Sequence, residues 1–126
     1  MPSPEDARVA RLATVDPAGR PHVVPICFVI EGDTLYTAVD DKPKRTRRLQ
    51  RLRNIEANPR VEIVIDHYDE NWTTLWWVRL RGTARIVDDP RAVELLAAKY
   101  PQYTESLPTG PVIAVAIGER SEWRAT

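Results

Sequence analysis

The strongest chemical signal in the sequence is a run of basic side chains between Lys42 and Arg53, a stretch without a single acidic residue. Its seven cations are Lys42, Lys44, Arg45, Arg47, Arg48, Arg51 and Arg53. Four of these, beginning with Lys44 and ending with Arg51, follow the i, i+3, i+4, i+7 spacing of one helix face. Like charges without acidic partners repel one another, so we expect an external anion such as a phosphate to neutralise them. The alternative, that the run is an ordinary solvated face, stays open.

The remaining reactive side chains do not form a recognisable catalytic set. The two histidines, His22 and His67, are far apart in the sequence, and neither has a second His or Cys at metal-ligand spacing. A polar stretch could in principle gather a metal ion, although such residues more often solvate a loop: Asp66, His67, Asp69 and Glu70. The sequence also lacks a phosphate-binding Gly-rich loop of the Walker or dinucleotide type. We therefore predict no catalytic residue and no metal, but a binding protein whose reactivity comes from a bound redox cofactor.

Length and composition favour one domain, spanning residues 1–126. Lys and Arg total 18, as do Asp and Glu, so the basic run is a local feature and a dedicated nucleic-acid-binding protein is disfavoured. The single cysteine, Cys27, excludes an internal disulfide and fits a reducing compartment. No signal peptide and no membrane-spanning apolar run is expected. These features predict a cytoplasmic protein that binds neither membranes nor nucleic acids.

Alternating or β-branched segments predict six strands, at 8–15, 22–31, 34–39, 60–67, 75–88 and 112–117. The last can extend through 119–126, with Trp123 in phase with Val115 and Ile117. Ala10, Leu12 and Thr14 share one side of the first strand. In the strand at 75–88, the even positions are apolar or small and the odd positions are mostly polar, the pattern of a two-faced antiparallel strand.

Two residues interrupt this strand pattern. Pro25 cannot donate to a strand ladder, so it indicates an edge, a bulge or a place where a ligand approaches. Gly82 is expected to bend the strand at 75–88, as barrels require at their corners.

Helix signals occur at two places. Pro43 and the stop signal Asn58-Pro59 predict a helix through the basic run, anchored on the core by Leu49 and Leu52. Asp88-Asp89-Pro90 begins a second helix at about 90–100. Its expected buried stripe is Val93, Leu96 and Ala97, and a loop fenced by Pro101, Pro108 and Pro111 follows. Six strands joined by hairpins and only two helices predict a small, mainly β antiparallel barrel rather than a doubly wound parallel sheet.

Several short motifs follow one another in a characteristic order. They are V-P-I-C-F at 24–28, L-Y-T-A at 35–38, D-D-K-P-K-R at 40–45, R-N-I-E-A-N-P-R-V-E-I at 53–63 and L-W-W-V-R-L-R-G-T-A at 75–84. This order, from about Arg11 to Arg124, resembles the flavin/deazaflavin oxidoreductases, which share the FMN-binding split β-barrel of pyridoxamine-phosphate oxidase. Within that family, the chain looks most like the small actinobacterial branch of enzymes that depend on coenzyme F420.

The resemblance implies a homodimer with two cofactor clefts at the subunit interface. By that likeness, Val24, Pro25, Ile26 and Cys27 flank the deazaflavin ring, Thr37 lies beside it, and Lys42, Lys44 and Arg51 hold the phosphate. Trp76 and Trp77 would form part of the cleft wall, and the partner subunit could supply these side chains. Trp123 is a weaker candidate for the same role. Related proteins often have a lysine where this chain has Arg51, but arginine can hold a phosphate bidentately. For Trp76, core packing is the favoured alternative.

The function implied by this resemblance is hydride transfer between coenzyme F420 and a small, unidentified organic substrate. An FMN-dependent oxidoreductase of the same fold is one alternative, since FMN also ends in a phosphate. A non-catalytic carrier of F420 is another. A nucleic-acid-binding module that stacks bases on tryptophan is disfavoured by the zero net charge.

Overall fold

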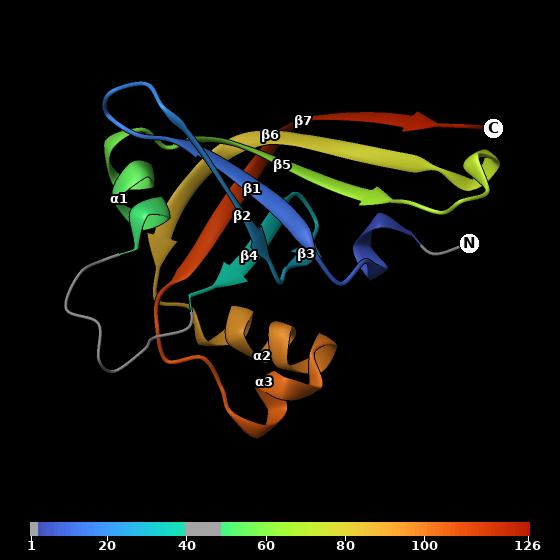
Figure 1. Cartoon of the computed structure of the whole chain (residues 1–126). Coiled ribbons are helices and arrows are strands. Elements are labelled where there is room, and N and C mark those ends of the chain that lie inside the picture. Colours follow the sequence, from blue (N-terminus) through green and yellow to red (C-terminus); the bar gives the residue numbers. More distant parts are fainter. Residues whose placement is uncertain (1–2, 40–48) are drawn as a thin grey trace.

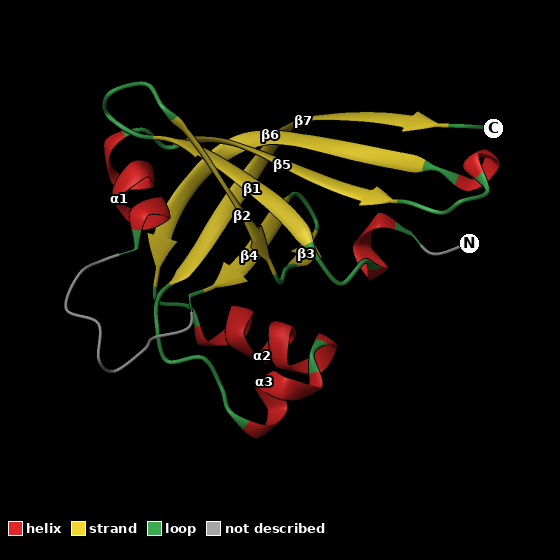
Figure 2. Ribbon diagram, in the orientation of Figure 1, coloured by secondary structure: helices red, strands yellow, loops and turns green. Residues whose placement is uncertain are grey.

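The computed structural model describes residues 3–39 and 49–126, so Lys42 and Lys44 lie outside the described residues. The described chain forms one antiparallel seven-stranded sheet with helices at its ends (Figures 1 and 2). The strands are β1 (Ala10–Val15), β2 (Pro21–Ile26), β3 (Val29–Glu31), β4 (Thr34–Ala38), β5 (Arg60–His67), β6 (Trp76–Val87) and β7 (Val112–Arg124). Their order across the sheet is β2-β1-β5-β6-β7-β4-β3. The predicted mainly β antiparallel fold is confirmed.

The sheet closes on itself because of one short connection. β2 and β3 lie at opposite edges of the sheet, yet only Cys27 and Phe28 separate them in the sequence. The sheet must therefore curl until its two edges meet at this link, which makes an open barrel with a seam between β2 on one side and β3 and β4 on the other. The predicted strand at 22–31 is thus two strands, which raises the count from six to seven. Pro25 lies in edge strand β2, where a missing N–H is tolerated.

The barrel interior is filled by the inward-facing residues of these strands. Ala10, Leu12 and Thr14 are all buried, as the alternation of the first strand predicts. The even positions of β6 up to Leu80 are likewise buried, beginning with Trp76 at 4% exposure. Burial of this apolar surface is the main stabilisation of the barrel.

A β-bulge changes the phase of β7. Arg81 pairs with Glu119 and Gly82 with Ile117, so Gly118 is an extra residue between the two pairs. A Cβ on Gly82 would lie 2.3 Å from the backbone oxygen of Ala116, so only glycine permits this close approach. The irregularity in the ladder thus falls at Gly82, where the sequence predicts a bend, although the extra residue lies on β7.

The same bulge overturns the predicted phase of Trp123. Val115 and Ile117 pair with Ala84 and Gly82, on the inward-facing register of β6. Beyond the extra residue, Trp123 pairs instead with Trp77 and is 44% exposed. A one-residue insertion moves every later side chain of a strand to the other face, which explains the error.

The first predicted helix begins later than expected. α1 is Gln50–Ala57, and Leu49 before it has an extended backbone at φ −63°, ψ 151°. The carbonyl of Leu49 accepts the first helical hydrogen bonds, from the N–H groups of Leu52 and Arg53. The predicted helix therefore does not run unbroken from Pro43, and Lys44, Arg47 and Arg48 lie outside the described residues. The predicted stop is confirmed, and Leu49 and Leu52 both pack on the core.

The second helix is α2 (Pro90–Lys99), capped by the carboxylate of Asp89 as predicted. Its fully buried residues are Ala92 and Leu96, while Val93 and Ala97 are half-buried, so the buried stripe is rotated by one residue from the prediction. The predicted loop after it contains a third helix, α3 (Pro101–Glu105), which starts at a proline in its first turn. Two single turns of 3-10 helix, η1 (Pro4–Asp6) and η2 (Trp72–Thr74), complete the described elements. Among the described residues, no helix is long and apolar enough to cross a membrane.

Candidate functional site

The residues predicted to flank a cofactor ring lie along the seam. On β2, Val24 is half-buried on the inner side and Ile26 is buried, while Pro25 between them is exposed. Cys27 follows in the link that joins the two sheet edges and is half-buried. These four residues therefore line the β2 side of the seam, with Pro25 directed away from the interior.

Thr37 lies on the opposite side of the seam. β3 pairs with β4 only up to Val29 and Tyr36, so Thr37 has β7 on one side and, within the described part of the chain, no ladder partner on the other. The antiparallel register places the chain that precedes Val29, including Cys27, alongside this free edge. The Thr37 side chain is buried, at 3% exposure. The predicted ring-flanking residues thus lie on β2, on the link after it and on β4, the parts of the sheet that the Cys27–Phe28 link joins.

Arg51, the one described residue of the predicted phosphate set, is the second residue of α1. Its guanidinium is half-buried, and its Nε is buried without a hydrogen-bond partner among the described residues. Desolvation lowers the pKa of Arg51 below its ordinary value, while the nearby phenol of Tyr103 on α3 acts in the opposite direction. Arginine remains charged at neutral pH despite such a shift. An N–H donor on a buried cation is expensive to leave unsatisfied, so this position suits an anionic ligand.

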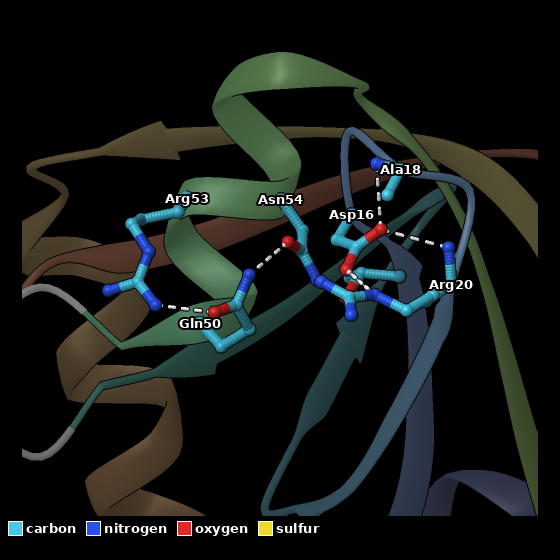
Figure 3. A network of polar contacts seen from close by, with 7 residues as sticks. Asp16, Ala18, Arg20, Gln50, Arg53 and Asn54 are labelled. Atoms are coloured by element: carbon cyan, nitrogen blue, oxygen red, sulfur yellow. Dashed lines mark hydrogen bonds and ion pairs between the residues drawn. The ribbon is translucent and has the colours of Figure 1, made fainter.

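A buried polar network fixes the helix that carries Arg51 (Figure 3). Asn54 is completely buried, and its Nδ2 donates to Thr14 Oγ1 on β1 at 2.9 Å. Its Oδ1 accepts from Gln50 Nε2 at 2.6 Å, and Arg53 in turn donates to Gln50 Oε1. These bonds determine the rotation of α1 against β1. Asn54 and Thr14 are not among the predicted site residues; the available signal was an asparagine inside a helix at a position facing the core.

Another unassigned polar group lies near the network. His22 pairs with Thr14 across β1 and β2, which places both side chains on the same inward face. Its Nδ1 is buried without a hydrogen-bond partner among the described residues. After Arg51 on α1, His22 is therefore a further residue with a buried nitrogen that lacks a partner among the described residues, and it lies on β2, two residues before Val24.

The tryptophans predicted to wall a cleft separate into two groups. Trp76 is a core residue that stacks on His67, with 6.0 Å between ring centroids, so the core-packing alternative is confirmed. Trp77 is half-buried on the outer face beside its cross-strand partner Trp123, and the guanidinium of Arg79 lies 5.7 Å from its ring centroid. The start of β6 lies at the far end of the sheet from α1 (Figure 1). Trp77 and Arg51 therefore do not meet within one chain.

The polar residues that could in principle gather a metal ion are Asp66, His67, Asp69 and Glu70. Among the residues that the structure describes, no group of three or more His, Cys, Asp and Glu side chains could hold a metal ion, and Asp66, His67, Asp69 and Glu70 all belong to that part of the chain.

Two adjoining hollows, of about 370 and 710 Å³, open beside the β1–β2 turn and share Val15 and Arg60. Neither is lined by a predicted cofactor residue.

Solved structures confirm the architecture. The chain is similar to conserved hypothetical protein Rv2991 from Mycobacterium tuberculosis, with 20% identity, a TM-score of 0.74, and coverage of 94% of this chain and 78% of that one. It is also similar to a FAD-binding protein from Mesorhizobium loti, with 19% identity, a TM-score of 0.67, and coverage of 94% and 87%. HutZ, the heme storage protein from Vibrio cholerae, has 17% identity, a TM-score of 0.74, and coverage of 96% and 88%. At such identities these likenesses show the fold alone.

The family is shown by the sequence itself. No curated protein matches this chain. The family model described as pyridoxamine 5'-phosphate oxidase matches residues 3–124, which include every strand and every helix described above. The open barrel, with its two edges joined through Cys27 and Phe28, is accordingly the split barrel that the resemblance predicted. The chain belongs to the pyridoxamine 5'-phosphate oxidase family.

Proposed function

We propose that this protein is an oxidoreductase that binds coenzyme F420 and transfers hydride between the deazaflavin and a small organic substrate. The observation that carries the proposal is Arg51, a half-buried cation at the start of α1 whose Nε has no hydrogen-bond partner within residues 3–39 and 49–126. It comes three residues after the end of a segment, 42–48, that holds five further cations and no acidic residue. Such a surplus of positive charge suits a coenzyme with both a phosphate and an acidic oligoglutamate tail.

In this proposal the chain supplies binding and orientation. When bound, the coenzyme supplies the hydride chemistry. Val24, Pro25, Ile26 and Cys27 on one side of the seam, and Thr37 on the other, flank its ring, and the apolar members keep water from the reacting face. Arg51, with Lys42 and Lys44, holds the phosphate. Hydride transfer depends more on alignment than on acid–base groups, which agrees with a predicted site that has no catalytic side chain.

The same proposal includes a homodimer with two cofactor clefts at the interface. Trp77 lies on the outer face near the far end of the sheet from α1, so it can complete a site that contains Arg51 only from a second copy. Mixing Arg51→Ala and Trp77→Ala subunits tests this arrangement. Each variant alone should bind the coenzyme poorly, whereas the mixed dimer regains one intact cleft of its two. Failure of the mixture to recover any binding would exclude a shared site.

Two alternatives use the same seam. An FMN-dependent oxidoreductase is favoured by the family match and by the fold shared with a FAD-binding protein. A carrier that binds its cofactor without turnover is favoured by the fold shared with a heme storage protein. Both alternatives retain Arg51 as an anion ligand.

Side-by-side titrations of the purified protein with coenzyme F420 and with FMN distinguish these possibilities. We expect a colourless protein that binds F420 more tightly than FMN, measured by quenching of tryptophan fluorescence. Reduced coenzyme is then offered with a panel of unsaturated and carbonyl-bearing acceptors. Tighter binding of FMN would establish the flavin alternative, and tight F420 binding without reduction of any acceptor would favour the carrier.

A further inference from the structure

Polar bonds converge on the two-residue link where the sheet edges meet. The carbonyl oxygen of Phe28 accepts from Lys99 Nζ at 2.9 Å, and its N–H donates to the hydroxyl of Tyr100 at 3.0 Å. The Tyr100 hydroxyl also lies 3.1 Å from the Phe28 carbonyl and 3.0 Å from the Arg8 carbonyl, to one of which it can donate at a time. Phe28 belongs to neither β2 nor β3, so these side chains replace the ladder bonds that its backbone lacks.

Lys99 makes further contacts that link three parts of the chain. Its Nζ donates to the carbonyl of Glu5 in η1 at 2.9 Å, in addition to the bond to Phe28. The same ammonium lies 3.8 Å from the ring centroid of Phe28, a side chain with no exposed surface. Lys99 therefore joins the end of α2 to η1 and to the link between β2 and β3, through charge-assisted hydrogen bonds and a cation–π contact.

The surroundings of Lys99 make its charge sensitive to pH. Burial, and then the positive charge of Arg8, lower the pKa of the Lys99 ammonium to about 8. Asp6 and Glu5 from η1, and Cys27 from the link, act in the opposite direction. Burial raises the pKa of the neighbouring Tyr100, so the tyrosine remains a neutral donor where Lys99 titrates.

We propose that Lys99 is a positioning residue, which together with Tyr100 holds the Phe28 link and thereby sets the position of the β2 side of the seam for its ligand. The inference rests on the proposed function, because it requires Val24–Cys27 to flank the coenzyme. Cys27 immediately precedes Phe28, so a displacement of the Phe28 carbonyl moves the end of the ring-flanking segment.

Amide hydrogen exchange on the unliganded protein tests the first half of this inference. In Lys99→Met the Phe28 amide should exchange about tenfold faster than in the wild type, the effect of losing roughly one hydrogen bond's worth of local stability. Lys99→Arg should restore most of the protection, because it keeps the charge and the donors. Ala98→Met, at an exposed position on the same helix, is the matched control and should leave Phe28 unchanged. Tyr100→Phe is the second variant, and it should expose the same amide by removing its acceptor. Unchanged Phe28 exchange in both Lys99→Met and Tyr100→Phe would overturn the inference.

Titration with coenzyme F420 tests the second half. Lys99→Met should bind the coenzyme several-fold more weakly than the wild type, while Lys99→Arg should bind about as tightly as the wild type. If the Phe28 amide exchanges faster in Lys99→Met but the affinity for the coenzyme is unchanged, Lys99 and Tyr100 have a purely structural role. That result would refute the proposal that they position the β2 side of the seam. Failure of the proposed function is seen separately: Arg51→Ala would then leave coenzyme affinity unchanged, whatever the Phe28 amide does.

Discussion

Replacement of Asn54 by alanine is the most direct test of how the barrel holds α1. The side chain is completely buried, donates to Thr14 Oγ1 at 2.9 Å and accepts from Gln50 Nε2 at 2.6 Å. Each buried hydrogen bond contributes about 1 kcal/mol, and a buried hydroxyl left without its partner costs about 1 kcal/mol more. Asn54→Ala should therefore lower the free energy of unfolding by about 3 kcal/mol.

Urea unfolding measures this loss of stability. A double-mutant cycle with Thr14 shows how much of it comes from the Asn54–Thr14 hydrogen bond. Thr14→Val alone should also destabilise, because it leaves the Asn54 amide buried without an acceptor. The double variant should lose about 1 kcal/mol less stability than the sum of the two single variants, which is the coupling energy expected of two residues that share one hydrogen bond. Glu94→Ala, on the exposed side of α2, should change stability by less than about 0.5 kcal/mol. Additive losses in the cycle, or an Asn54→Ala protein as stable as this control, would refute the reasoning.

Three other predictions concern stability. Gly82→Ala should cost at least about 2 kcal/mol in urea unfolding, because its Cβ would lie 2.3 Å from the Ala116 backbone oxygen; near-wild-type stability would contradict the bulge. Asp89→Ala should cost about 1 kcal/mol, since the carboxylate accepts from two N–H groups at the start of α2; Asp89→Asn should retain most of that stability. For Lys99, the pKa falls from 10.5 to about 8 on folding, so the unfolded chain binds more protons between these values and the free energy of unfolding should rise with pH across that window. Because the amine is only half-buried, we expect a rise of about 1 kcal/mol relative to Lys99→Met, and a parallel pH profile of the two proteins would contradict it.

Local patterns predicted most of the strands because one face of each is buried. The alternation in β1, β5 and β6 matches the observed inward positions, and the turn after Val15 is fixed by Asp16, whose carboxylate accepts from the N–H groups of Ala18 and Arg20 (Figure 3). Such contacts join residues that are close in sequence, so the local residue pattern indicates them. The predicted phase of Trp123 was wrong because a single extra residue, Gly118, turns the later side chains of β7 to the opposite face of the sheet. Nothing in the local pattern of β7 indicates that insertion.

Only part of the candidate site could be predicted from the sequence, for a different reason. The proline in V-P-I-C-F and the edge position it implies could be predicted, but the seam itself arises because β2 and β3 meet across the whole sheet. Asn54 and Lys99 gained their roles through partners 40 and 71 residues away in sequence. Those pairings depend on tertiary packing, which residue type and spacing do not encode. The basic run was correctly identified as a concentration of charge, but its predicted helix was wrong at Leu49, where an extended residue begins α1.

The central claim, that the cation on α1 binds a phosphorylated redox coenzyme at the seam, is tested most directly by comparing Arg51→Ala with Arg85→Ala. Arg85 is an exposed arginine on β6 and serves as the matched control. Loss of a buried charged hydrogen bond of about 1.5–3 kcal/mol should weaken F420 binding by Arg51→Ala about 10- to 100-fold, with a smaller dependence on salt than the wild type. Arg85→Ala should bind as the wild type does. Equal affinities of the two variants for both F420 and FMN would contradict the account.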